Sequence, residues 1–203
     1  MKANMPGRCA RCCLRELHCV CASIRMASTS LQFVVLRHVG ETYKSTNSVR
    51  WAALALAHCQ IIAYSGRTSE GLETVARLDP QHTVLLYPDE GTARAASPPA
   101  RTSRPDTIVV LDGTWRQVRR MHNQLAVLHR LPKLSLSKPS EGLAPLRHAL
   151  RLHHRSTLQA MADAVATLDS EATAEPLRAL HALTVEATHR SRGTWPLTEG
   201  GEG

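Results

Sequence analysis

The stretch "VVLDGTWRQVRRMHNQ" (residues 109–124) indicates the centre of the fold, because an apolar strand ends in it and a helix begins. The short β-branched run 108–111 is typical of a buried strand, and Gly113 ends the run. Thr114 and Gln117 have the spacing of a capping box, in which each side chain satisfies a backbone N–H at a helix start. Asp112 is therefore predicted on a strand-to-helix turn. In open α/β sheets, ligands bind at the edge where such turns lie.

Strand-like and helix-like segments alternate around this stretch. Apolar runs that end in turn residues predict strands at 31–38, 59–66, 83–88, 107–111 and 133–137. Capping residues followed by apolar periodicity predict helices at 46–58, 114–129, 156–168 and 175–190, the last with Pro176 at its start. The Pro-, Ala- and Ser-rich stretch 89–106 reads as an exposed loop. This alternation predicts an α/β fold with a mostly parallel sheet.

The composition is that of a folded globule. The chain has 203 residues, of which 43% are hydrophobic and only 3% are aromatic. No apolar segment is long enough to span a bilayer, and the N-terminal residues are polar and Cys-rich where a signal peptide would be apolar. We therefore expect a soluble, cytoplasmic protein with no membrane association. A monomer is favoured over an oligomer, although the sequence leaves this open.

Positive charge is concentrated in one region. Residues 115–155 contain nine Lys or Arg and one acidic residue, Glu141, so this region alone carries the net charge of +8 found for the whole chain. A nucleic acid is the natural partner of such a segment, and a merely solvated basic surface is the alternative. On the helix after Asp112, Arg116, Arg119 and Arg120 are candidates for RNA phosphate contacts.

A cysteine cluster, "CARCCLRELHCVC" (residues 9–21), precedes the first strand. Two close pairs of thiols suit a tetrahedral structural zinc ion, and four protein ligands leave no open position for catalysis. The predicted ligands are Cys9, Cys12, Cys19 and Cys21, with Cys13 and His18 as spare candidates. Disulfides or free buried thiols are the alternatives. Cys59 precedes an apolar run and is interpreted as a small core residue rather than a nucleophile.

Five motifs occur in an order that resembles one known family. The cysteine knuckle comes first, and "LRHVGETYKSTNS" (36–48) is similar to the family's L-x-H-x-x-E and T-N motifs. "LLYPDEGTA" (85–93) is similar to its L-Y-P loop, and "RSTLQAMADA" (155–164) to its S-T-L-E-A helix start. The D-x-T-W signature stands at residues 112–115, and the sequence therefore resembles the DTW-domain family over residues 9 to 168. Gln159 departs from the pattern, which has Glu there. Gln can complete a capping box but cannot act as a general base.

The resemblance implies a fold related to the SPOUT methyltransferases, with a C-terminal trefoil knot that no sequence pattern would show by itself. It also implies two regions, a zinc-binding knuckle (1–25) and a DTW catalytic domain (26–195). The implied reaction moves the 3-amino-3-carboxypropyl group of S-adenosylmethionine to N3 of a uridine in tRNA and releases 5′-methylthioadenosine.

Site residues follow from combining the resemblance with the sequence. Asp112 is the hypothesised acceptor of the uridine N3 proton, and a turn carboxylate bonded to backbone N–H groups is the alternative. Trp115 is interpreted as a pocket wall, a base-stacking residue or a core anchor. The predicted donor contacts are Leu86, Tyr87, Pro88, Leu111, Asp112, Gly113, Thr114, Trp115, Ser135, Leu136 and Ser137. The predicted substrate pocket contains Arg37, His38, Thr46 and Asn47, the last two of which are alternatively helix caps.

Two other functions stay open at this point. A SPOUT-type RNA methyltransferase would share the fold, the donor and the charge, but it would release S-adenosylhomocysteine. A non-catalytic, zinc-containing RNA-binding protein would keep the cysteines and the charge without binding S-adenosylmethionine.

Overall fold

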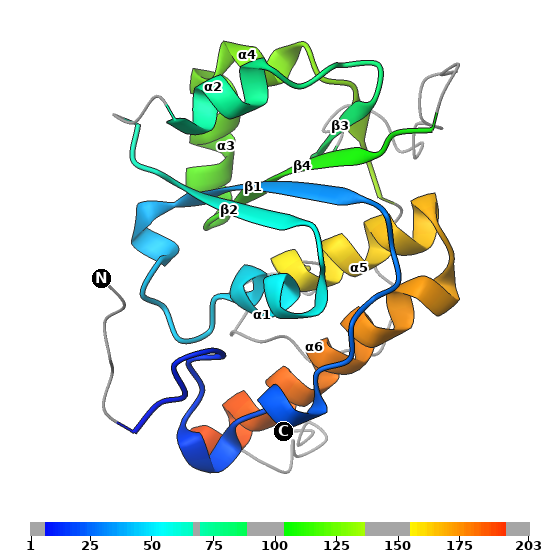
Figure 1. Cartoon of the computed structure of the whole chain (residues 1–203). Helices are drawn as coiled ribbons and strands as arrows, with labels where there is room; N and C mark the ends of the chain where they lie inside the picture. The colour runs from blue at the N-terminus through cyan, green and yellow to red at the C-terminus, as the bar shows by residue number, and fades with distance from the viewer. Residues whose placement is uncertain (1–6, 67–69, 89–103, 137–154, 194–203) are drawn as a thin grey trace, which may run out of the picture.

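The computed structural model describes residues 7–66, 70–88, 104–136 and 155–193, and its centre is a single five-stranded sheet (Figure 1). The strands are β1 (Gln32–His38), β2 (Cys59–Tyr64), β3 (Thr83–Leu86), β4 (Thr107–Asp112) and β5 (Lys133–Leu134). Their order is β2-β1-β4-β3-β5, and every neighbouring pair is parallel. The predicted α/β fold with a mostly parallel sheet is therefore confirmed.

Helices cover both faces of this sheet (Figure 1). On one side lie α1 (Ser48–Ala55), α5 (Thr157–Leu168) and α6 (Glu171–Ser191), and on the other lie α2 (Glu70–Ala76), α3 (Trp115–Gln124) and α4 (Ala126–His129). Side chains of β4 alternate between the two cores, with Val110 on the α1–α5–α6 side and Leu111 on the α3–α4 side. Asp112 follows in this alternation, so its carboxylate points toward α1 and α5.

The cysteine-rich segment packs on the same core as α1 and α6. It contains two short 3₁₀ helices, η1 (Glu16–His18) and η2 (Cys21–Ser23), and a third, η3 (Val39–Glu41), follows β1. Cys12, Leu14 and Val20 are buried in the core cluster that also contains Trp51 of α1. The indole N–H of Trp51 donates a hydrogen bond to the Cys12 carbonyl oxygen at 2.8 Å. The segment is thereby joined to the core on the α1–α5–α6 side of the sheet by both apolar and polar contacts.

Both predicted capping boxes are present. The Thr114 hydroxyl accepts from the Gln117 backbone N–H while the Gln117 side chain accepts from Thr114 N–H, and Ser156 and Gln159 repeat the pattern at α5. A Cβ at Gly113 would lie 3.1 Å from Gln117 Cβ, which is closer than ordinary contact. The start of α3 therefore favours glycine directly after Asp112.

Several element boundaries differ from the prediction. The helix predicted at 114–129 is interrupted at Leu125, which leaves the helical backbone and is buried in the core. The strand predicted at 133–137 covers only Lys133–Leu134 within the described residues. The last helix begins at Glu171, because Ser170 caps it by accepting from Thr173 N–H, and Pro176 is therefore inside the helix rather than at its start. Helix α2 was not predicted, and β4 extends one residue further, to Asp112.

The predicted loop and the predicted knot are not tested by the described residues. Most of the predicted loop 89–106 lies outside the described residues, as do residues 137–154 ahead of α5. The five parallel strands do not by themselves establish a trefoil knot, so the knot stays a prediction. No helix in the described ranges combines the length and the apolar composition needed to cross a membrane.

Candidate functional site

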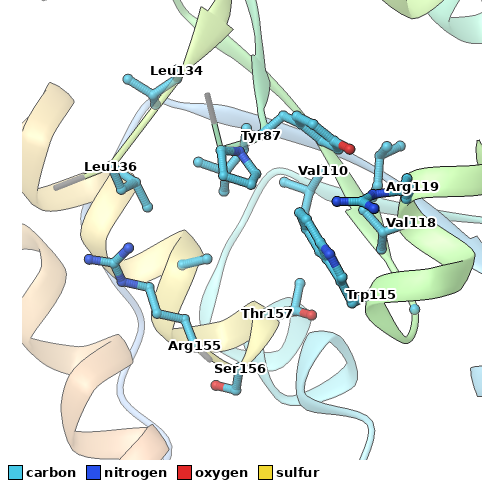
Figure 2. A pocket seen from close by; sticks show the side chains of 15 residues that line it. Tyr87, Val110, Trp115, Val118, Arg119, Leu134, Leu136, Arg155, Ser156 and Thr157 are labelled. Atoms are coloured by element: carbon cyan, nitrogen blue, oxygen red, sulfur yellow. The ribbon is translucent and has the colours of Figure 1, made fainter. Parts of the chain in front are cut away.

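A cavity of about 530 Å³ opens where β3, β4 and β5 end and where α3 and α5 begin (Figure 2). Its size lies within the range typical of small-molecule sites, and its place at the carboxyl ends of parallel strands is the usual one for ligands in α/β sheets. Seven of the predicted donor contacts line it, namely Leu86, Tyr87, Pro88, Leu111, Gly113, Trp115 and Leu136. Asp112, Thr114 and Ser135 do not, and Ser137 lies outside the described residues.

One side of the cavity is aromatic and cationic. The rings of Tyr87 and Trp115 are stacked, with centroids 5.9 Å apart and planes inclined by 24°. The Arg119 guanidinium carbon lies 5.6 Å from the centre of the Trp115 ring, within cation–π range. Trp115 is 38% exposed, so the interpretation of this residue as a core anchor is wrong. Its exposed surface belongs to the cavity wall.

The opposite side comes from the start of α5, which the site prediction did not include. Arg155, Ser156 and Thr157 line the cavity there, and Figure 2 shows Arg155 across from Trp115 and Arg119. Arg155 Nε lies 2.7 Å from Asp163 Oδ2, and burial lowers the pKa of the Arg155 guanidinium. These residues belong to the "RSTLQA" motif, in which Ser156 and Gln159 have the spacing of a capping box. Ser156 is indeed the N-cap of α5.

Asp112 lies behind the cavity wall. The residue is only 4% exposed. Each of its carboxylate oxygens accepts a side-chain hydrogen bond at 2.7 Å, Oδ2 from Asn47 Nδ2 and Oδ1 from Thr157 Oγ1. Burial raises the pKa of Asp112 above its usual range, and the two hydrogen bonds oppose that rise. The alternative of a turn carboxylate held by backbone N–H groups does not describe these contacts.

None of the four predicted substrate-pocket residues is among those that line the cavity, and two of them, Arg37 and Asn47, are neighbours of Asp112. Arg37 is the register neighbour of Asp112 on β1, and burial lowers the pKa of its guanidinium. His38 Nδ1 accepts from Gly40 N–H and lies 3.0 Å from Gln117 Nε2. Asn47 caps α1 by accepting from Arg50 N–H, which confirms its capping interpretation. The side-chain oxygen of Asn47 thus caps the helix, and its side-chain nitrogen donates to Asp112. Thr46, the preceding residue, is half-buried, and no hydrogen bond of its side chain is assigned in the described residues.

Helix α3 presents its basic side chains outward. The helix buries Val118 and Met121, and its arginines, Arg116, Arg119 and Arg120, are exposed. Of the three, Arg119 also lines the cavity. The basic surface and the cavity therefore meet at this helix. Of the six other basic residues in the predicted segment, three lie outside the described residues, namely Lys138, Arg147 and Arg151.

The four predicted metal ligands form one cluster. The Sγ atoms of Cys9, Cys12, Cys19 and Cys21 all lie within 4.8 Å of one another, with 3.6 Å between Cys9 and Cys21 and 3.8 Å between Cys12 and Cys19. A tetrahedron of Zn–S bonds of about 2.3 Å places its sulfurs about 3.8 Å apart, so the donor set fits zinc. These separations are far longer than an S–S bond, and all six cysteines are free, so the disulfide alternative is wrong.

The thiols of the cluster differ in acidity. Backbone N–H groups of Cys12 and Arg11 lower the pKa of Cys9 to about 6, which favours the thiolate that a metal needs, whereas burial raises the pKa of Cys12 and of Cys21. Cys13 and His18, the spare candidates, are not in the cluster. Cys59 packs against the core, and burial raises its pKa to about 12, which agrees with its interpretation as a small core residue.

Comparison with known proteins bears on the whole chain. A family model described as "DTW domain" matches residues 7–189. A protein from Drosophila melanogaster named "tRNA-uridine aminocarboxypropyltransferase 2" is 26% identical over 201 residues, which covers 89% of this chain and 74% of that protein. No solved structure matches. Because the family match includes the cysteine cluster, the D-x-T-W turn and the start of α5, the resemblance read from the motifs is confirmed: the chain belongs to the DTW domain family.

Proposed function

We propose that this protein transfers the 3-amino-3-carboxypropyl group of S-adenosylmethionine to N3 of a uridine in tRNA and releases 5′-methylthioadenosine. The observation that carries the proposal is the cavity at the carboxyl ends of β3 and β4, which the D-x-T-W turn and the arginine-bearing helix α3 border together. The name of the Drosophila relative supports the same reaction.

The cavity suits the donor on chemical grounds. Trp115, Tyr87 and Pro88 offer apolar and aromatic surface for a nucleoside, and the Arg155 guanidinium and the Ser156 hydroxyl at the start of α5 offer polar partners for an amino-acid arm. S-adenosylmethionine supplies a sulfonium that activates three carbon atoms. Selection among them is a matter of which carbon the pocket holds in line with the attacking nitrogen, so positioning carries much of the catalysis.

The proposal extends to the architecture around the site. We place the catalytic function in residues 26–195 with a SPOUT-like trefoil knot, and a structural zinc ion on the cysteine knuckle of residues 1–25. The knuckle's four thiolates would hold the metal without taking part in the reaction, because four protein ligands complete its tetrahedron. We also propose that the protein acts in the cytoplasm as a monomer.

Mass spectrometry of nucleosides tests the function directly. tRNA is incubated with the protein and S-adenosylmethionine and digested, and the small-molecule by-product is identified in the same reaction. The expected products are 3-(3-amino-3-carboxypropyl)uridine and 5′-methylthioadenosine. A methylated nucleoside with S-adenosylhomocysteine would instead identify a methyltransferase. Binding of RNA with no modified nucleoside and no bound donor would identify a non-catalytic RNA-binding protein.

Salt dependence tests the proposed RNA surface on α3. Each Lys or Arg that contacts a phosphate releases counterions, so the slope of log K against log salt decreases by about one for each contact removed. Replacing Arg116, Arg119 and Arg120 together by Gln should therefore reduce the slope by up to about three. A matched variant replaces Arg25, which pairs with Glu175 of α6, together with Arg190 and Arg192 at the C-terminal end of α6. All three are exposed, and none is on α3, so this variant should leave the slope unchanged. Equal slopes for the α3 variant and the wild type would place the RNA on another surface.

A further inference from the structure

Two side chains donate hydrogen bonds to the buried carboxylate of Asp112, and one of the two lines the cavity. Among the described residues, Asp112 accepts side-chain hydrogen bonds from Asn47 and Thr157. Thr157 lines the cavity and Asn47 does not. Figure 2 shows Thr157 at the start of α5, on the cavity side. The Thr157 hydroxyl is therefore the group that stands between the cavity and the carboxylate.

The direction of this hydrogen bond determines what Thr157 can do. A hydroxyl has one proton to donate and two lone pairs that accept. The proton of Thr157 Oγ1 is given to Asp112 Oδ1 at 2.7 Å, so the hydroxyl is an acceptor toward any donor that enters the cavity. An N–H group of a bound nucleobase is such a donor. A general base must come within about 2.6–3.2 Å of the heavy atom whose proton it removes. Asp112 is only 4% exposed and lies behind the cavity wall, so it does not offer such a contact directly.

We propose, on the basis of the function proposed above, that Thr157 is a catalytic residue that relays the uridine N3 proton to Asp112. The N3–H bond breaks and its proton passes to Thr157 Oγ1, while the proton of Thr157 passes to Asp112 Oδ1. The N3 electron pair forms the new N–C bond to the donor's carboxypropyl arm. The C–S bond breaks, and its electron pair stays on sulfur, which leaves as the neutral thioether 5′-methylthioadenosine. The carboxylate and the sulfonium are neutralised together, so charge balances.

The surroundings of Asp112 suit a terminal proton acceptor. Charged groups face it from two elements: Arg37 from β1 lowers the pKa of Asp112 and Glu41 from η3 raises it, while Glu41 itself pairs with Lys44 at 2.5 Å. Burial is the largest influence and raises the pKa of Asp112, which gives the carboxylate a higher proton affinity than a surface Asp. A base must start unprotonated, so the wild-type rate should fall as the pH is lowered through this raised pKa.

The test compares Thr157→Val with Thr157→Ser. Valine keeps the branched shape and removes the hydroxyl, whereas serine keeps the hydroxyl. We expect Thr157→Val to lower the single-turnover rate about 10²-fold and Thr157→Ser to stay within about ten-fold of the wild type. Affinity for S-adenosylmethionine, measured by calorimetry, should change only a few-fold in both and would show that the variants fold. Thr167→Val is the matched control, because Thr167 is exposed near the other end of the same helix and bonds only to the Asp163 carbonyl in the described residues.

A tRNA with a more acidic uridine N3–H distinguishes the proton relay from a purely structural role of Thr157. tRNA transcribed with 5-fluorouridine has a more acidic N3–H, which leaves with less help from a base. Under the relay, the deficits of Thr157→Val and of Asp112→Asn should both shrink by at least about ten-fold with this tRNA. Equal deficits with fluorinated and ordinary tRNA, or a Thr157→Val rate equal to that of the wild type, would overturn the relay alone. A wild-type protein that forms no aminocarboxypropyl product would overturn the proposed function and the relay together.

Discussion

Replacing Asp112 by Asn is expected to lower the single-turnover rate of uridine modification about 10²- to 10⁴-fold, with donor affinity changed only a few-fold. Asn keeps the size of the side chain but cannot take up a proton. The Asn side chain also has one acceptor oxygen where Asp112 has two. The hydrogen bond to Asp112 from either Asn47 or Thr157 is therefore lost, because that donor meets the amide N–H₂ of the new residue instead of an oxygen. We therefore expect a loss of stability of about 1–3 kcal/mol beside the kinetic effect. The rate, the donor affinity and the unfolding temperature are to be measured on the same preparation.

Asp169→Asn provides the control for this loss of stability. Asp169 is a partly buried carboxylate at a helix end that accepts from Thr29 and Arg104, and it is not among the residues lining the cavity. Its replacement should affect stability in a similar way while the rate per folded molecule stays at the wild-type level. A near wild-type rate for Asp112→Asn would mean that Asp112 only ties β4 to α1 and α5, and that the N3 proton leaves by another path.

The position of Asp112 shows how far sequence reasoning reaches at this site. Its place after a buried strand and before a capped helix could be predicted, because the signals are local: an apolar run, a glycine, and a capping box that spans four residues. Its burial could not be predicted in this way. The side chains that close over it, Asn47 and Thr157, lie 65 and 45 residues away in the chain, and only the packing of α1 and α5 on the same sheet face brings them together.

The same distinction explains the site residues that sequence reasoning missed. The cavity residues on β3 and at the D-x-T-W turn follow from the rule that ligands bind at the carboxyl ends of parallel strands. Arg155 and Thr157 lie at a helix N-terminus, where Ser and Thr occur mainly as caps. Thr157 stands one residue after the cap, so its hydroxyl is not needed by the helix and is directed to Asp112 instead. A hydroxyl at the first helical position, next to a capping Ser, is the signal that was available.

Local helix propensity predicted the helix boundaries poorly where core packing determines the backbone conformation. Leu125 interrupts the predicted long helix because the chain turns there to bury Leu125, Leu128 and Leu131 against the α3 side of the sheet. Pro176 was placed at a helix start by its fixed backbone angle, yet the capping bond from Ser170 begins the helix five residues earlier. In both places a favourable contact outweighed the intrinsic preference of one residue.

Loss of the proposed zinc site is expected to have the largest effect on stability. Cys12→Ser should lower the free energy of unfolding by about 4 kcal/mol or more, which corresponds to a fall of roughly 8–16 °C in the unfolding temperature for a chain of this size. The reason is that Cys12 supplies one of the four clustered sulfurs and is fully buried in the core with Leu14 and Val20. Without a cation, the four neighbouring sulfurs have no common partner, and the segment that they hold against α1 and α6 loses its cross-link.

Cys13→Ser is the matched control for Cys12→Ser, because Cys13 is the next residue and lies outside the four-thiol cluster. It should change the unfolding temperature by no more than about 2 °C, a shift that corresponds to less than about 1 kcal/mol. Protein purified without added metal should contain about one zinc ion per chain in the wild type and in Cys13→Ser, and much less in Cys12→Ser. A chelator should reproduce the Cys12→Ser unfolding temperature in the wild type. If metal-free wild-type protein instead unfolds at the same temperature as the zinc-loaded form, with all four thiols reacting freely, then the knuckle is held by its apolar contacts with the core and not by a metal.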